Sequence, residues 1–397
     1  MIVTGSRTVK LENVSIEDGL YLRQTLFDKA RRIVVKVGSA VLTDQNGIAE
    51  DVVQNIAREI SFLHRSGREV ILVSSGAVAA GIKKISYNRN SSLGIKEKQA
   101  LAAIGQSSLM QTYERCFSSF DHTIAQVLLT HSDLARRNRY LNVRNTLLTL
   151  FKFHVIPVIN ENDTVSVQEL RFGDNDTLGA YICNLIEADM FICLTDVNGL
   201  YNKDPEIHHD AEPIYTVPEI TSEIDDLVHN SKSSLGTGGM KSKLKAARIV
   251  SAGGGCSFIG PGKEKEILQK LFSGQMVGTF FLPCKERIQS RKRWIATVLK
   301  PQGTLVLDAG ACAALCNGGK SLLPSGIKEV HGGFGVGDAV HCCDENGTVI
   351  AVGLVNYDSE DTIKIMGKHT STIEKLLGYK DNDEVMHRDN LVILEHH

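Results

Sequence analysis

The sequence lacks any apolar run that approaches the ~20 residues needed to cross a bilayer, and its N-terminus lacks the apolar core of a signal peptide. It also lacks a basic excess, because 44 lysines and arginines face 46 aspartates and glutamates, for a formal net charge of −2. A dedicated nucleic-acid binder normally carries such an excess, so that class is disfavoured. No Cys-x-x-Cys pair occurs among the nine scattered cysteines, which disfavours a zinc finger or a disulfide framework. We therefore expect a cytoplasmic protein with reduced, mostly buried thiols and no membrane partner.

With 397 residues, the chain is too long for one ordinary hydrophobic core, and two domains are the natural expectation. The basic, irregular stretch near residue 290 is typical of a linker. The last four residues, Leu394–His397, resemble the remnant of a purification tag, and we count neither histidine as a ligand. The expected segments are an N-terminal extension (1–27), an α/β domain (28–283), the linker (284–302), a small β-rich domain (303–380) and a C-terminal tail (381–397).

The stretch from residue 155 to 205 carries many of the polar residues that are candidates for chemistry. Val155–Ile159 and Met190–Thr195 are apolar, rich in β-branched residues and flanked by turn formers, which is typical of buried parallel strands. Between them, Asp176–Ala188 has the spacing of an amphipathic helix. In α/β units, ligands gather at the carboxyl ends of the strands. The candidates in the loops there are Asn160, Glu161, Asn162, Asp163, Gly173, Asp174, Asn175, Asp176, Thr195 and Asp196.

Two earlier strands end in turns that contain glycine. In the strand at 32–37, RIVVKV, Lys36 is followed closely by Gly38. Lys36 either lies on an edge strand with its charged head in solvent, or it points a cation into a site where the glycine turn admits a phosphate. The strand at 69–73 ends in Ser74-Ser75-Gly76 directly before a predicted helix. That turn either offers backbone N–H groups to a carboxylate or phosphate, or is an ordinary helix cap.

A further glycine-rich segment runs from Gly236 to Lys243 and opens a predicted helix. It follows residues 206–234, which are polar and which we expect to be poor in helix. Glycines that open a helix and are followed by lysines indicate a phosphate site, because backbone N–H groups and a cation meet there. The spacing does not fit a Walker A loop. The alternative is a flexible surface loop, which the two lysines directly after the glycines make the weaker interpretation.

The short apolar runs after residue 303, broken by glycine and polar turns, predict a small β-rich module. One helix is expected at Ala309–Leu315. The cluster Gly332–Asp338 lacks the spacing of a dinucleotide-binding loop, so we expect no nucleotide there. The expected strands are Thr304–Leu307, Ala339–Cys342, Thr348–Leu354 and Thr362–Ile365.

Six of these motifs occur in the order seen in the glutamate 5-kinases, a family of the amino-acid kinase superfamily, which the chain resembles over about residues 30–283. Residues 303–380 resemble the PUA domain that some members carry at the C-terminus. The resemblance implies a three-layer α/β/α sandwich with a mostly parallel central sheet, followed by a small β-rich PUA-like domain. The motifs are Lys36-Val37-Gly38-Ser39, Ser74-Ser75-Gly76-Ala77, Val158 to Asp163, Gly173 to Asp176, Thr195-Asp196 and Gly236 to Lys243.

The resemblance implies ATP-dependent phosphorylation of the γ-carboxylate of L-glutamate to γ-glutamyl phosphate, the first step of proline biosynthesis. It also implies use of Mg²⁺, feedback inhibition by proline and a homo-oligomer, here expected as a dimer or tetramer. One departure is the N-terminal extension, which shorter members lack. The implied catalytic residues are Lys36, Lys243 and, as the group that organises them, Asp176. The implied glutamate-binding residues are Ser75, Gly76, Asn160, Asp163 and Asn175. The implied ATP-binding residues are Lys36, Gly38, Thr195, Asp196, Thr237, Gly238, Gly239, Met240, Lys241, Ser242 and Lys243.

The chemistry of these residue types agrees with that implication. A carboxylate acceptor has a reference pKa near ~4.3, so it is already ionised at neutral pH and needs no general base. The difficulty is repulsion between an anionic nucleophile and a triphosphate, which cations, backbone N–H groups and Mg²⁺ relieve. The sequence offers no dedicated carboxylate cage, so we expect Mg²⁺ to be held mainly by ATP rather than by protein ligands.

Two alternatives stay open. The first is another amino-acid kinase whose acceptor is a carbamate, acetylglutamate, aspartate or a nucleoside monophosphate. The second is an RNA-binding protein, because PUA domains often serve RNA-modifying enzymes. Residues 303–380 hold six lysines and no arginine against nine acidic residues, a net charge of −3, which disfavours RNA binding by this module on electrostatic grounds. A regulatory or packing role is the better expectation.

Overall fold

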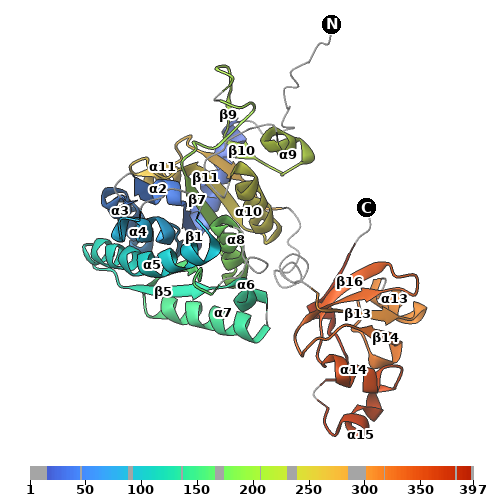
Figure 1. Cartoon of the computed structure of the whole chain (residues 1–397). Helices are drawn as coiled ribbons and strands as arrows, with labels where there is room; N and C mark the ends of the chain where they lie inside the picture. Colours follow the sequence, from blue (N-terminus) through green and yellow to red (C-terminus); the bar gives the residue numbers. More distant parts are fainter. Residues whose placement is uncertain are drawn as a thin grey trace. The chain divides into compact units, whose positions relative to one another are not determined.

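The computed structural model describes residues 16–44, 47–87, 93–135, 137–165, 174–205, 207–229, 239–284, 301–316, 318–380 and 382–394 (Figure 1). The chain divides into two compact units. One holds residues 1–131 and 144–287, and the other holds residues 132–143 and 288–397.

The larger unit is organised around an eight-stranded sheet with β1 near its middle. All neighbouring strands run parallel except β11 and β12. The central place of β1 excludes the edge-strand position that was one interpretation of Lys36. In order across the sheet, the strands are β10 (Thr216–Val217), β12 (Thr279–Phe281), β11 (Cys256–Pro261), β7 (Met190–Thr195), β1 (Arg32–Val37), β4 (Glu69–Val73), β6 (Ile156–Glu161) and β5 (Ile124–Leu129). Two short hairpins pair β2 (Thr43–Asp44) with β3 (Gly47–Ile48) and β8 (Leu200–Tyr201) with β9 (Pro213–Ile214).

Helices cover both faces of this sheet, which confirms the predicted three-layer α/β/α sandwich (Figure 1). Alternation along β1 sends Ile33, Val35 and Val37 into a core shared with α3, α5 and α11. Lys36 faces the other side, where α8 and α10 pack. The helices that lie wholly in this unit are α1 (Ile16–Lys29), α2 (Ser39–Leu42), α3 (Glu50–Arg65), α4 (Ala77–Lys84), α5 (Ile95–Ser118), α8 (Asn175–Ile186), α9 (Ser222–His229), α10 (Met240–Ala252) and α11 (Ile267–Phe272). The division between the units passes through α6 (His131–Ala135) and α7 (Arg137–Lys152), because residues 132–143 are grouped with the smaller unit.

Two glycines let α4 and α5 pack backbone against backbone. A Cβ atom at Gly105 would lie 1.8 Å from the carbonyl oxygen of Ala77, and one at Gly81 would lie 2.0 Å from that of Leu101. Real Cβ atoms do not approach so closely, so any larger residue must separate the helices. This contact fixes the start of α4, and with it the turn that follows β4.

The expectation that residues 206–234 are poor in helix is wrong for α9. Ile224 of this helix is fully buried, so one apolar position holds it against the domain. Acidic residues in its first turn suit the positive end of the helix dipole. Asp225 pairs with Arg248 of α10 at 2.7 Å. The helix therefore depends on contacts distant in sequence, which local polarity does not reveal.

The smaller unit is built on a five-stranded sheet over its own apolar core, which includes Leu305, Val340 and Tyr357. Only β13 and β15 run parallel within it. In order, the strands are β14 (Ile327–His331), β13 (Gly303–Leu307), β15 (Ala339–Cys343), β16 (Val349–Leu354) and β17 (Leu391–Ile393). Its helices are α13 (Ala309–Cys316), α14 (Ser359–Ile365) and α15 (Ile373–Leu377), with 3₁₀ turns η2 (Pro324–Gly326), η3 (Thr370–Thr372) and η4 (Arg388–Asn390).

The strand predicted at Thr362–Ile365 is wrong, because these residues form the second half of α14. The carboxylate of Asp358 accepts a hydrogen bond from the backbone N–H of Asp361 at 2.8 Å and caps the helix. Thr362 and Ile365 are then buried one turn apart. The helix cap at Asp358 therefore outweighs the preference of the β-branched residues in Thr362–Ile365 for a strand. Among the described residues, none of the helices combines the length and apolar character needed to cross a membrane.

Candidate functional site

A buried ion-pair cluster lies at the carboxyl ends of β1 and β7, centred on Asp176. The carboxylate is fully buried, and each of its oxygens faces one lysine. Lys36 pairs with Oδ1, and Lys243 Nζ lies 3.4 Å from Oδ2. The Ser242 hydroxyl donates to Oδ2 at 2.7 Å, and the Cys193 sulfur lies 3.4 Å from Oδ1. The structure thus brings together the three residues that the sequence pointed to as catalytic.

The electrostatics of this cluster favour its charged form. Burial opposes the charge of Asp176, but the positive charges of Lys36 and Lys243 and the hydrogen bonds from Lys36 and Ser242 hold its pKa below the usual value. Burial also opposes the charge of Lys36, but the negative charge of Asp176 and the hydrogen bond between the two side chains raise the pKa of Lys36 overall. Two lysines against one aspartate leave a formal charge of +1 in a place shielded from water. Such a site attracts an anion.

A second network surrounds Asn175, the residue before Asp176. Its Nδ2 atom lies 2.8 Å from the carbonyl oxygen of Ser74, 2.8 Å from the hydroxyl of Ser75 and 3.1 Å from Oδ1 of Asn160. Asn160 donates in turn to the carboxamide oxygen of Gln106 on α5 at 3.0 Å. Asn175 therefore contacts two other predicted glutamate-binding residues, Ser75 after β4 and Asn160 on β6.

The start of α8 holds these two networks together. Asp174 caps the helix, because its Oδ1 atom accepts from the backbone N–H of Thr177 at 2.7 Å. Further along, Gly179 lets the helix lie directly on β1 and β7: a Cβ atom there would lie 2.6 Å from the ring of Phe191 and 3.6 Å from Cβ of Lys36. The consecutive residues Asn175 and Asp176 thus contact different strands of the sheet: Asn175 meets the ends of β4 and β6, and Asp176 meets Lys36 of β1.

The predicted nucleotide-binding residues lie at the ends of β1 and β7 and at the start of α10. The N–H of Gly38 donates to the carbonyl oxygen of Leu194 at 3.1 Å, which ties the turn after β1 to β7. The Thr195 hydroxyl donates to Asp196 at 2.9 Å. The N-cap of α10 is Gly239, and it is followed by Met240, Lys241, Ser242 and the buried Lys243. The first N–H groups of a helix have no acceptor one turn back within the helix, and such helix starts commonly bind anions. Thr237 and Gly238, like Gly173, lie outside the described residues.

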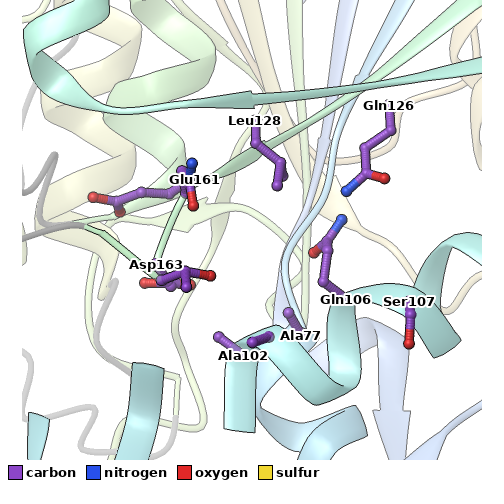
Figure 2. A pocket seen from close by; sticks show the side chains of 11 residues that line it. Ala77, Ala102, Gln106, Ser107, Gln126, Leu128, Glu161 and Asp163 are labelled. Carbon is purple, nitrogen blue, oxygen red and sulfur yellow. The ribbon is translucent and has the colours of Figure 1, made fainter. Parts of the chain in front are cut away.

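A cavity of about 300 Å³ lies beside β5, β6 and α5 (Figure 2). Its wall includes the predicted glutamate-binding residue Asp163, and Glu161 lies near it. Figure 2 shows the carboxamides of Gln106 and Gln126 pointing toward one another on the other side. Gly76, with φ of +99°, makes the left-handed turn that starts α4, whose first residue also lines the cavity. The lining residues are Ala77, Ala102, Ala103, Gln106, Ser107, Gln126, Leu128, Glu161, Asn162, Asp163 and Thr164.

Two residues in these networks are absent from the sequence prediction. Gln106 lies in the middle of α5, and nothing in its local sequence distinguishes it. Cys193 lies in an apolar strand and resembles an ordinary core residue, but its Cα is the register partner of Lys36 on β1. Only the strand pairing reveals that these two side chains are neighbours. Among the described residues, no three His, Cys, Asp or Glu side chains gather in a way that could hold a metal ion.

Comparison with known proteins gives matches to both parts of the chain. Residues 31–259 match the amino acid kinase family, and residues 303–377 match the PUA domain. The glutamate 5-kinase of Desulfotalea psychrophila is 60% identical over 375 residues, which cover 94% of this chain and 100% of that protein. The glutamate 5-kinase of Geobacter sulfurreducens is 47% identical, with 94% of this chain and 100% of that protein covered. That of Syntrophus aciditrophicus is 46% identical, with 94% and 96% covered.

Proposed function

The chain belongs to the amino acid kinase family, and within it to the glutamate 5-kinases, and from this premise we propose that it transfers the γ-phosphoryl group of ATP to the γ-carboxylate of L-glutamate. The product is γ-glutamyl phosphate, and the step is the first of proline biosynthesis. The observation that carries the proposal is the buried cluster in which Lys36 and Lys243 share Asp176. Two fixed cations suit a reaction whose barrier comes mainly from anionic repulsion.

The proposed mechanism needs no proton transfer to start. The acceptor carboxylate is ionised at neutral pH and attacks the γ-phosphorus directly. Lys36 and Lys243 stabilise the charge that spreads over the transferring group, and they need little reorganisation because Asp176 already holds both. Asp176 itself acts neither as base nor as nucleophile, since both its oxygens are occupied and its pKa is lowered. Its role is to place the two ammonium groups.

In this proposal, glutamate lies between the cavity and the Asn175 network. Asp163 supplies a carboxylate for the α-ammonium group, and Asn160 and Asn175 supply polar groups fixed by their mutual hydrogen bond. Ser75 and Gly76 offer a hydroxyl and a backbone N–H at the start of α4. The acceptor carboxylate is then directed toward Asp176 and its lysines, because Asn175 and Asp176 are adjacent in one helical turn.

On the nucleotide side, we assign ATP to Gly38, Thr195, Asp196 and the segment Thr237–Lys243. The lysine pair and the open first turn of α10 fit an anionic polyphosphate. Mg²⁺, when bound, neutralises charge on the phosphates. We assign that ion mainly to the phosphates of ATP, because such sites commonly take few protein ligands.

Four further properties belong to the proposal. Proline acts as a feedback inhibitor, the chain forms a homo-oligomer (a dimer or a tetramer), and the reaction takes place in the cytoplasm. The PUA-like domain has a regulatory or packing role, because the net charge of −3 over residues 303–380 is unfavourable for binding a polyanion such as RNA.

The test is to trap the product. Incubation with L-glutamate, ATP, Mg²⁺ and hydroxylamine should give γ-glutamyl hydroxamate, because hydroxylamine intercepts an acyl phosphate. A parallel panel with aspartate, acetylglutamate, carbamate and a nucleoside monophosphate, followed by ADP release, tests the other acceptors of the superfamily. Absence of hydroxamate from glutamate, or faster ADP release with another acceptor, would overturn the proposal.

A further inference from the structure

Cys193 is a buried thiol in the phosphoryl-transfer cluster, and the mechanism above gives it no role. It lies on β7, and its Cα is the register partner of Lys36 on β1, so both side chains rise from the same face of the sheet. The thiol is fully buried, and its sulfur lies 3.4 Å from Oδ1 of Asp176. That oxygen is also the one paired with Lys36.

The protonation states fix which group donates. Burial, together with the charge of Asp176, raises the pKa of the Cys193 thiol to about 12. The thiol therefore keeps its proton at neutral pH. Asp176 is held ionised by its lysines and can only accept. The Cys193 thiol accordingly donates a hydrogen bond to the carboxylate oxygen Oδ1 of Asp176.

We propose that Cys193 is a positioning residue of the phosphoryl-transfer site, whose S–H group holds Oδ1 of Asp176 so that the carboxylate presents one oxygen to each lysine. Each oxygen then has one charged and one neutral donor: Lys36 and Cys193 on Oδ1, Lys243 and Ser242 on Oδ2. This inference rests on the proposed function, because its effect is on the placement of the two catalytic cations.

The consequence is geometric. Without the thiol, Oδ1 keeps a single donor among the described residues, so the carboxylate is held less firmly against rotation about its Cβ–Cγ bond. The separation between Lys36 and Lys243 would then be less precisely fixed. Small misplacements of catalytic groups are costly, since preorganisation is what lets fixed charges stabilise a transition state.

The test compares variants that separate hydrogen bonding from packing. Cys193→Ser keeps a donor at about the same place, whereas Cys193→Val fills the space without one. We expect Cys193→Ser to stay within about twofold of the unmodified kcat, and Cys193→Val to fall by roughly three- to tenfold, the worth of one modest hydrogen bond. The glutamate KM should change in neither. If Cys193 served packing alone, Cys193→Ser would have the lower kcat of the two variants, because a buried hydroxyl is worse tolerated than a methyl group. That result would overturn the proposal.

A matched control is Cys183, a buried thiol on α8 that lies outside the Asp176 cluster. Cys183→Ser and Cys183→Val should both leave kcat unchanged. Losses of kcat equal to those of the Cys193 variants would show that the Cys193 effect is only one of packing. Thermal unfolding of every variant checks folding.

An infrared measurement tests the contact itself. The S–H stretching band isolated by subtracting the spectrum of Cys193→Ala should lie at low frequency, as for a thiol bonded to a charged acceptor, and should rise in Asp176→Asn. A band at the frequency of a free thiol would overturn the proposal, even if neither kinetic variant folds. Failure of the hydroxamate test would remove the reaction but leave this band in place, so the two failures are distinguishable.

Discussion

Replacing Lys243 by methionine removes one of the two cations on Asp176 while keeping an unbranched side chain in a site that is only 5% exposed. Asp176 keeps its pair with Lys36 and its hydrogen bond from Ser242, so its charge is not left without a partner and the chain should fold. The missing charge should mainly raise the free energy of the transition state rather than weaken substrate binding. Loss of one preorganised charge stabiliser typically costs on the order of 10²–10³ in kcat, or about 2.7–4 kcal/mol.

The assay is ADP release coupled to a dehydrogenase, at saturating glutamate and ATP, with circular dichroism to confirm folding. Lys245→Met is the matched control, because Lys245 is an exposed residue of the same helix and should tolerate the change. The glutamate KM should stay within a few-fold of its original value in both variants. A folded Lys243→Met variant with kcat near that of the control would refute the assignment of Lys243 as a catalytic cation.

Three further outcomes are expected. Glutarate, which lacks the ammonium group, should be a very poor substrate, and Asp163→Ala should raise the glutamate KM strongly, because polar groups placed for an ammonium are otherwise left unpaired; equal rates with glutarate and glutamate would contradict this ammonium pocket. A chain that ends at Gln289 should keep kinase activity and change at most in its regulation, because every assigned catalytic residue precedes residue 244; a folded but inactive truncation would show that the PUA-like domain helps build the site. The pKa of Asp176 is lower than its ordinary 3.8 in the folded chain, so its stabilisation is present above pH 3.8 and is lost as the pH falls through the folded pKa. The advantage of the unmodified chain over Asp176→Asn in the free energy of unfolding should therefore shrink below about pH 3.8, and a difference that is constant with pH would argue against this ion pair.

Those parts of the fold that rest on strong local signals are predictable from the sequence. β1, β4 and β7 have the same bounds in the prediction and in the structure, because an apolar β-branched run flanked by turn formers leaves little choice. α4 begins where Gly76 allows a left-handed turn. Lys36 also stood out, since a lysine inside an apolar strand needs a partner or a way to solvent.

Contacts that depend on tertiary arrangement are not predictable in this way. The sequence shows an apolar strand around Cys193, but nothing in it says that this strand pairs with β1 or in which register. Gln106 meets Asn160, which lies 54 residues further along the chain, only through the packing of α5 beside β6. The strand assigned to the residues of α14 failed for the opposite reason. A local cap at Asp358 overrode a β-branched run whose propensity is weak by itself.

The start of α8 joins the two networks of the candidate site. Asn175 contacts the residues assigned to glutamate and Asp176 contacts those assigned to the phosphoryl group, yet they are neighbours in a turn capped by Asp174. The contact at Gly179 leaves the helix no room to approach β1 and β7 more closely. A shift of α8 would therefore move Asn175 and Asp176 together rather than one past the other. In the proposed mechanism, the group that positions the acceptor and the carboxylate that holds the two lysines thus occupy adjacent positions along the backbone, which keeps their separation short and constant.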